Sequence, residues 1–117
     1  MWIVKLHSEF DAELVAFPVD VQNEIAAAAR VIKREGPHLG RPQADTLKGS
    51  RLSNLKEFRF TAYGQPWRLA YAFDPARQAV FLVAASKAGV SQKVFYQRLI
   101  KIAERRFFNH IISGDPL

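Results

Sequence analysis

The sequence of 117 residues has no cysteine and no apolar run that approaches the roughly 18 residues needed to span a membrane. Without cysteine there is no disulfide framework, no thiol nucleophile and no cysteine-based zinc site. The missing apolar run excludes an integral membrane protein. The apolar stretch at residues 1–7 is also too short for a secretion signal, because polar and acidic residues follow it at once. We therefore expect a cytoplasmic protein.

Internal repeats, low-complexity tracts and linkers are absent as well. The length suits one domain with a single modest core. Apolar residues make up 49% of the chain, which is typical of a folded protein rather than a disordered one. We therefore expect residues 1–117 to form a single domain.

Acidic residues are scarce in most of the chain, whose formal net charge is +6. Residues 1–24 hold one basic residue, Lys5, against five acidic ones, whereas residues 25–117 hold the other 16 basic residues against six acidic ones. A basic excess confined to one part of a small domain is typical of a protein that binds a polyanion. Two other interpretations stay open: charge that only keeps the protein soluble, and a basic surface that pairs with an acidic protein.

Apolar periodicity predicts one strand and two helices in the first third of the chain. Residues 2–6 read as a short strand, and Ser8 is the expected N-cap of a short helix that ends near Pro18. A second helix begins at Pro18 and ends at Gly36, where a glycine followed by proline stops it. The stretch from Gly36 to Asn54 reads as a loop.

Three segments rich in aromatic and apolar residues follow, at 55–61, 67–74 and 79–86. The turns between them are so short that neighbouring strands must be antiparallel. Ser91 then caps a last helix that runs to about Ile112. The order predicts an α+β domain in which a small antiparallel sheet, made of the N-terminal strand and a three-strand meander, packs against two N-terminal helices and a C-terminal helix.

Alternation of side chains along the first two strands of the meander places two arginines on one face. Arg59 and Glu57 point one way while the aromatic residues beside them point the other, and Arg68 likewise lies opposite the aromatic residues of its strand. If the aromatic faces pack on the helices, both arginines project from the open face. The small side chains of Ala70 and Ala72 would leave a shallow concavity there.

Further cations lie close to this face in the predicted arrangement. Lys87 follows the third strand, and Lys48, Arg51 and Lys56 lie before or at the start of the first. An arginine fork binds phosphate oxygens two at a time, and on a rigid strand it stabilises the charge of a phosphoryl-transfer transition state. The pattern indicates nucleic-acid binding more strongly than catalysis. The alternative is that an arginine only pairs with a carboxylate such as Glu57.

Four segments resemble phage-derived HigB-like toxins of the RelE/ParE superfamily. They are Leu-Lys-Gly-Ser-Arg-Leu at 47–52 with Leu-Lys-Glu-Phe-Arg-Phe at 55–60, Trp-Arg-Leu-Ala-Tyr-Ala-Phe at 67–73, the strand 80–85 leading to Lys87, and the closing helix from Phe95 to His110. The match spans about residues 1–112 in the same order of elements. It implies a RelE/ParE-type fold and the toxin of a type II toxin–antitoxin pair.

For HigB-like members the resemblance implies cleavage of messenger RNA in the ribosomal decoding site, with no metal or other cofactor. The ribose 2′-hydroxyl attacks the adjacent phosphate in that chemistry. By position, Arg59 and Arg68 would clamp the phosphate, while Lys48, Lys56 and Lys87 would contact the backbone or transfer protons. A lysine among other cations has a lowered pKa, as a base acting near neutral pH requires.

The proton donor and acceptor are less well defined. Glu57 is a candidate base, or it only orients an arginine. Tyr96 and His110 are candidate acids by resemblance, but the helical pattern favours a core or rim position for Tyr96 and surface packing for His110. His7 and His38 have no partner at a useful spacing, so we expect no metal site.

The resemblance also implies partners, namely the ribosome with its mRNA and a helix-turn-helix antitoxin in a heteromeric complex. The antitoxin is expected to cover the basic surface or the N-terminal helices. Two other functions stay open: a non-enzymatic ParE-like inhibitor of DNA gyrase, and a basic nucleic-acid-binding protein without toxicity.

Overall fold

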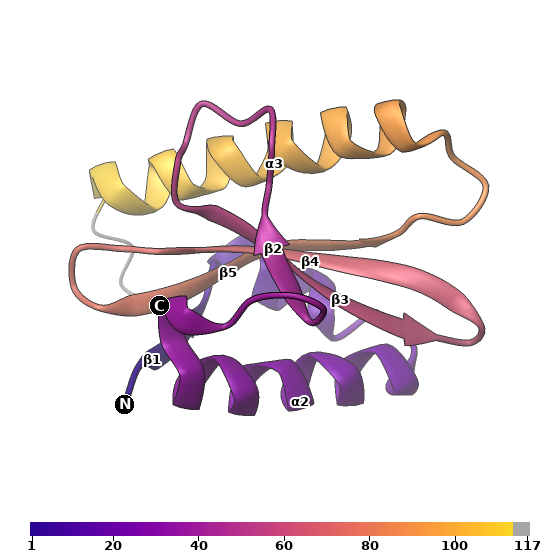
Figure 1. The fold of residues 1–117 in the computed structure, drawn as a ribbon, viewed down its shortest axis with the longest axis horizontal. Helices are drawn as coiled ribbons and strands as arrows, with labels where there is room; N and C mark the ends of the chain where they lie inside the picture. Colours follow the sequence, from indigo (N-terminus) through magenta and orange to yellow (C-terminus); the bar gives the residue numbers. More distant parts are fainter. Residues whose placement is uncertain (114–117) are drawn as a thin grey trace.

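The computed structural model describes residues 1–113 and shows the predicted α+β fold, with helices on both faces of one sheet (Figure 1). The five strands have the order β1-β5-β4-β3-β2, and they are β1 (Ile3–Leu6), β2 (Ala44–Thr46), β3 (Leu55–Ala62), β4 (Gln65–Phe73) and β5 (Gln78–Ser86). The helices are α1 (Ser8–Leu14), α2 (Val19–Glu35), the 3-10 helix η1 (Gly36–His38) and α3 (Gln92–Ser113).

The predicted meander is confirmed, because β3, β4 and β5 pair in antiparallel order. The sheet as a whole is mixed rather than antiparallel, since β1 pairs in parallel with β5. No tight turn joins these two strands, so nothing in the local sequence fixes their relative direction. The expected loop at 36–54 also contains η1 and the short edge strand β2, which pairs with β3.

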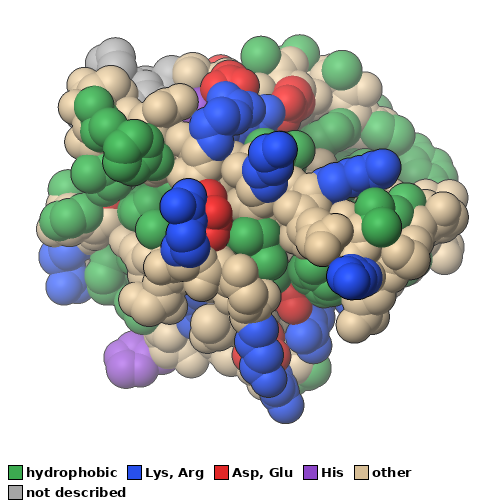
Figure 2. Space-filling view, turned by 90° about the horizontal axis from the view of Figure 1, so that it is seen from above, with side chains coloured by type: hydrophobic (Ala, Val, Ile, Leu, Met, Phe, Trp, Pro, Cys, Tyr) green, Lys and Arg blue, Asp and Glu red, His purple; other side chains and the backbone are tan. Residues whose placement is uncertain are grey.

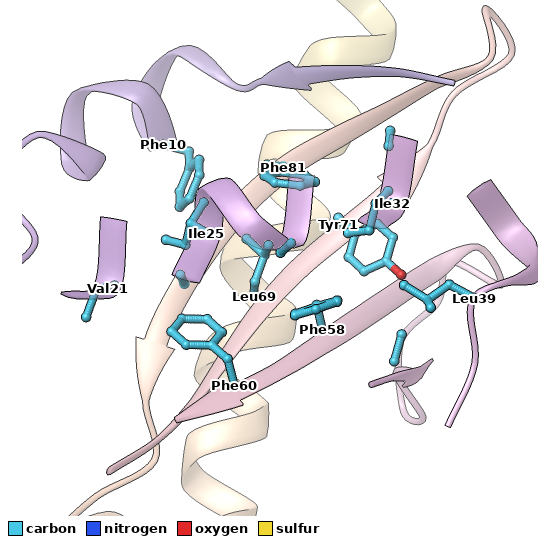
Figure 3. Packing of buried hydrophobic residues seen from close by; sticks show 14 of the residues in the cluster. Phe10, Val21, Ile25, Ile32, Leu39, Phe58, Phe60, Leu69, Tyr71 and Phe81 are labelled. Carbon is cyan, nitrogen blue, oxygen red and sulfur yellow. The ribbon is translucent and has the colours of Figure 1, made fainter. Parts of the chain in front are cut away.

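Aromatic side chains form the core between the sheet and the first two helices. As predicted, the aromatic faces of β3, β4 and β5 meet the apolar side of α1 and the apolar stripe of α2 (Figure 3). The largest fully buried members of this layer are Phe10, Val21, Ile32, Leu69, Tyr71 and Phe81.

The opposite face of the sheet is covered by α3, so the expectation of an open concavity at Ala70 and Ala72 is wrong. Both alanines are fully buried against the apolar stripe of α3, which is formed by Phe95, Leu99, Ala103 and Phe107. The small side chains let the helix approach the strands closely instead of leaving space above them. A cleft stays open on this face near β3 and the first turns of α3.

The ends of the helices are set by local hydrogen bonds. The N-cap of α1 is His7 rather than Ser8, because the His7 Nδ1 accepts from the amide of Glu9 at 3.1 Å. Gly36 ends α2 at a positive φ of 59°, and a Cβ added there would meet the ring of Trp2. None of the helices in residues 1–113 is long and apolar enough to cross a membrane.

Candidate functional site

The two predicted arginines lie directly opposite each other on neighbouring strands. Arg59 of β3 is the register partner of Arg68 of β4, so both side chains leave the same face of the sheet. That face is the one that carries α3. The side chain of Arg59 is 36% exposed and that of Arg68 is 15% exposed, so Arg59 is the more accessible of the two.

Glu57 lies between these arginines and connects them. Its Oε2 accepts from Arg59 Nη2 at 3.0 Å, and its Oε1 lies 3.5 Å from Arg68 Nε. The Glu57 side chain is 5% exposed, and a buried carboxylate is tolerated only when charged donors satisfy it. The ion pair between an arginine and Glu57, which the sequence left open as an alternative, is therefore present in the structure. This ion pair holds Arg59 in place at the edge of a cleft.

Tyr96 completes this cluster from the second turn of α3. Its hydroxyl donates to Glu57 Oε1 at 2.7 Å and accepts from Arg68 Nε at 3.3 Å. Burial raises the pKa of Tyr96, and the hydrogen bond to Glu57 raises this pKa further. The phenol thus stays protonated at neutral pH. The helical pattern favoured a core or rim role for Tyr96, and only the resemblance pointed to the site.

Lys87 reaches the same cluster from the end of β5. Its Nζ lies 5.3 Å from the centroid of the Tyr96 ring, within the range of a cation–π contact. Burial lowers the pKa of Lys87, and the nearby guanidinium of Arg68 lowers it further, against the opposing attraction of Glu57. A lysine with a lowered pKa gives up its proton more readily near neutral pH.

A cleft of about 660 Å³ opens beside this cluster. Its walls come from β2, β3, the segment after β2 and the start of α3, and its lining residues are Arg41, Asp45, Thr46, Leu47, Lys48, Glu57, Arg59, Gln92, Lys93 and Tyr96. Four of these are cations and two are carboxylates, so the cleft attracts anions. Asp45 of the unpredicted strand β2 binds Arg41 at 2.9 Å and lies 3.5 Å from Arg59.

Arg59 and Lys48 line the cleft. Arg68 and Lys87 belong to the cluster but do not line the cleft, and the two remaining expected cations belong to neither. Lys56 points to the opposite face of the sheet, where its Nζ donates to the carbonyls of Pro37 at 3.1 Å and Leu39 at 3.0 Å. The same alternation that unites Glu57 and Arg59 turns Lys56 away, so the expectation that it reaches this rim is wrong. Arg51, in the segment between β2 and β3, has a side chain that is 89% exposed. Its Nε lies 3.5 Å from Oε1 of Glu104 in α3.

The histidines have structural positions outside the cluster. His110 is not on the surface as expected: it is buried at the far end of α3, and its Nε2 lies 2.8 Å from Asp74 Oδ2. It is 14 positions beyond Tyr96, about 21 Å along the helix. His7 caps α1. Within residues 1–113 no three His, Asp or Glu side chains are grouped so that they could hold a metal ion.

The fold and the cleft together define a small basic α+β protein with a cluster of charged side chains between the β3–β5 meander and α3. The chain belongs to the phage-derived Gp49-like protein family (DUF891), whose sequence profile matches residues 12–108.

Two relatives come from Mycobacterium tuberculosis, and both are named as toxins. The chain is 44% identical to HigB2 over 92 residues, and this alignment covers 78% of this chain and 45% of HigB2. It is 39% identical over 94 residues to HigB3, covering 80% of each chain. The chain thus spans less than half the length of HigB2. No solved structure matched the chain.

Proposed function

We propose that this protein is the toxin of a type II toxin–antitoxin pair on a RelE/ParE-type fold, and that it acts as a metal-independent, ribosome-dependent endoribonuclease. The names of both relatives support the toxin assignment. The observation that carries the nuclease assignment is the cluster of Arg59, Arg68, Glu57 and Tyr96 beside a basic cleft.

In the proposed reaction the ribose 2′-hydroxyl attacks the adjacent phosphorus and the bond to the 5′-oxygen breaks. The products are a 2′,3′-cyclic phosphate and a 5′-hydroxyl end. Arg59, exposed to the cleft and fixed by Glu57, stabilises the additional negative charge on the phosphate oxygens. Because these groups are on strands, they are already in position before the RNA binds.

The proton transfers fall to groups already in contact within this cluster. A base must take the proton of the 2′-hydroxyl, and Lys87, with its lowered pKa, and the carboxylate of Glu57 are the candidates. An acid must protonate the leaving 5′-oxygen, and the phenol of Tyr96 is the candidate because its pKa is raised. Lys48 lines the cleft and contacts the RNA backbone.

The proposed partners follow from the same assignment. The protein acts in the cytoplasm on the mRNA held by the ribosome, and an antitoxin neutralises it. Complementary acidic groups on that antitoxin would meet the basic face.

The test is a purified translation system given wild type, Arg59→Ala or Arg30→Ala, with the 5′ ends of the message mapped. Wild type should cut ribosome-bound mRNA and leave 5′-hydroxyl ends. Arg59→Ala should lower the rate by about 100-fold, as removal of one transition-state donor does. The control removes an exposed arginine from α2, on the other face of the sheet, and should act like wild type.

Expression of the same variants in growing cells separates the alternatives. If wild type arrests growth while messages stay intact on ribosomes, the nuclease assignment is wrong. Inhibition of gyrase supercoiling by wild type and Arg59→Ala alike would point to the gyrase alternative.

A further inference from the structure

A second groove continues from the cleft along the outside of α3. It measures about 450 Å³ and lies between α3 and the segment that follows β2. Lys48, Lys93 and Tyr96 line both the cleft and this groove, so the two hollows adjoin each other. Figure 2 looks down onto the α3 side of the molecule, where Lys and Arg side chains are spread across the surface.

Three lysines provide the free positive charge of this groove. Lys48, Lys93 and Lys101 line it, all three are exposed, and none forms an ion pair or hydrogen bond within residues 1–113. Arg51 also lines the groove, but Glu104 already neutralises it. Lysines without a carboxylate partner bind an anion with no ion pair to break first.

The opposite wall of the groove is held in place by Glu104. Its Oε2 accepts from Ser50 Oγ at 2.8 Å and from the amide of Arg51 at 2.7 Å. These bonds fix the segment carrying Lys48 to the helix carrying Lys93 and Lys101. The backbone positions from which the lysine side chains extend are thus set before any ligand binds.

Lys93 and Lys101 are eight residues apart on one helix, which separates them by about 12 Å along its axis. This separation exceeds the distance between adjacent phosphates, so it suits two phosphates with one other between them on an extended strand rather than a single ion. Tyr96 and Ile100 add apolar surface between the lysines, against which bases can lie. A cationic groove with apolar surface along it is the usual arrangement for single-stranded nucleic acid.

We propose that this groove binds the backbone of single-stranded RNA that extends beyond the phosphate in the cleft, with Lys48, Lys93 and Lys101 as the residues that bind its phosphates. The inference depends on the proposed function only for what occupies the cleft. It adds a binding surface that holds several nucleotides outside the reacting bond, and it assigns affinity to the groove and cleavage to the cluster.

The test measures binding without cleavage. The probe is a fluorescent single-stranded RNA of about 12 nucleotides that is 2′-O-methylated throughout, so it has no nucleophile and cannot be cut. Affinity is measured by anisotropy across a series of salt concentrations. The variants are Lys48→Gln/Lys93→Gln/Lys101→Gln and a control with the same reduction of charge on α2, Arg30→Gln/Lys33→Gln/Arg34→Gln.

The groove variant should weaken binding at least tenfold at low salt and reduce the slope of log affinity against log salt by about 2, or about 0.7 for each phosphate that is no longer neutralised by a lysine. The α2 control should leave the slope within experimental error of wild type. Equal effects of both variants would show general charge rather than a site, and an unchanged slope in the groove variant would overturn the proposal. So would an equal weakening of binding to an RNA duplex of the same sequence, because the groove would then not be specific for a single strand.

This outcome is independent of the nuclease test. Arg59→Ala should bind the uncleavable RNA with nearly the wild-type slope of log affinity against log salt. The slope should differ by at most about 0.7, the contribution of one phosphate. Cleavage slowed about 100-fold in Arg59→Ala, together with the full effect of the lysine substitutions on binding, supports both proposals. If wild type binds the RNA through the lysines but never cuts mRNA, only the nuclease assignment fails.

Discussion

At the scale of single residues, the strand alternation located the members of the cluster that lie on β3 and β4 but not Tyr96 of α3. Arg59, Arg68 and Glu57 were placed on one face by the period of two, and the structure brings them into contact. The pattern could not show that Tyr96 joins them, because a tyrosine next to a buried helical stripe looks like a core residue. Position along the helix decides burial, whereas the hydrogen bonds of the hydroxyl depend on how α3 crosses the sheet.

Tyr96→Phe tests whether the phenol is the proton donor. The variant should lower the rate of mRNA cleavage by about 100-fold, the lower end of the range for general acid catalysis. Binding of uncleavable RNA should stay within a few fold of wild type, because every lysine and arginine that binds phosphate is still present. The control is Tyr63→Phe, at an exposed tyrosine between β3 and β4, which should cleave normally. A Tyr96→Phe protein with a wild-type rate would exclude the phenol as the acid.

At the scale of elements, the sequence predicted the strands and helices that carry long periodic patterns. The meander and α2 were predicted with nearly correct ends because turns and a glycine bound them. Strand β2 has only three residues, too few for a pattern, and its pairing with β3 depends on contacts distant in sequence. The prediction that one face of the sheet stays open was wrong because it depends on tertiary packing. Both faces of β4 are apolar enough to be covered by helices, and α3 covers the second face.

The segment after β2 is an element without regular structure, and we expect Glu104 to hold it. Glu104→Ala removes the acceptor for Ser50 Oγ and for the amide of Arg51. Hydrogen exchange at Arg51 should speed up by tenfold or more, and global stability should fall by about 1 kcal/mol. Glu35→Ala, which removes an exposed ion pair with Arg34, should change neither by a comparable amount. Unchanged exchange at Arg51 would show that the segment is held by its apolar contacts instead.

At the scale of the whole molecule, a part-buried ion pair and a buried contact between a histidine and an aspartate fix α3 to the rest of the fold. Arg106 donates to Glu13 of α1 at 2.6 Å and to the carbonyl of Leu82 in β5 at 2.7 Å. His110 contacts Asp74, which also accepts hydrogen bonds from the amide and the side chain of Gln78, the first residue of β5. The basic excess in residues 25–117 predicted a polyanion binder, and the family relatives confirm the HigB-like resemblance.

The contact between Asp74 and His110 should make stability depend on pH. Burial raises the pKa of Asp74, but the hydrogen bonds from His110 and Gln78 outweigh it and hold this pKa below its ordinary value. A carboxylate whose pKa is lower in the folded state stabilises the fold above its unfolded pKa of about 3.9, and this contribution disappears as the pH falls through the folded pKa.

Asp74→Asn should therefore cost about 2 kcal/mol in free energy of unfolding at pH 7, and its difference from wild type should shrink below about pH 4. Urea unfolding of both proteins from neutral pH down to about pH 2 measures this difference. The control Asp20→Asn, at an exposed carboxylate in the first turn of α2, should cost less than about 1 kcal/mol. A difference that stays constant down to acid pH would mean that Asp74 acts through shape rather than charge.

Helix α3 follows all the strands found in residues 1–113, yet it supplies Tyr96 to a cluster whose other members are on β3, β4 and the end of β5. A nascent chain whose strands have left the ribosome before α3 therefore has the arginines but not the phenol of Tyr96 beside them. It also lacks the side of the groove that α3 forms. Under the proposed function, a ribosome making this protein is not exposed to an active nuclease until α3 has emerged and docked.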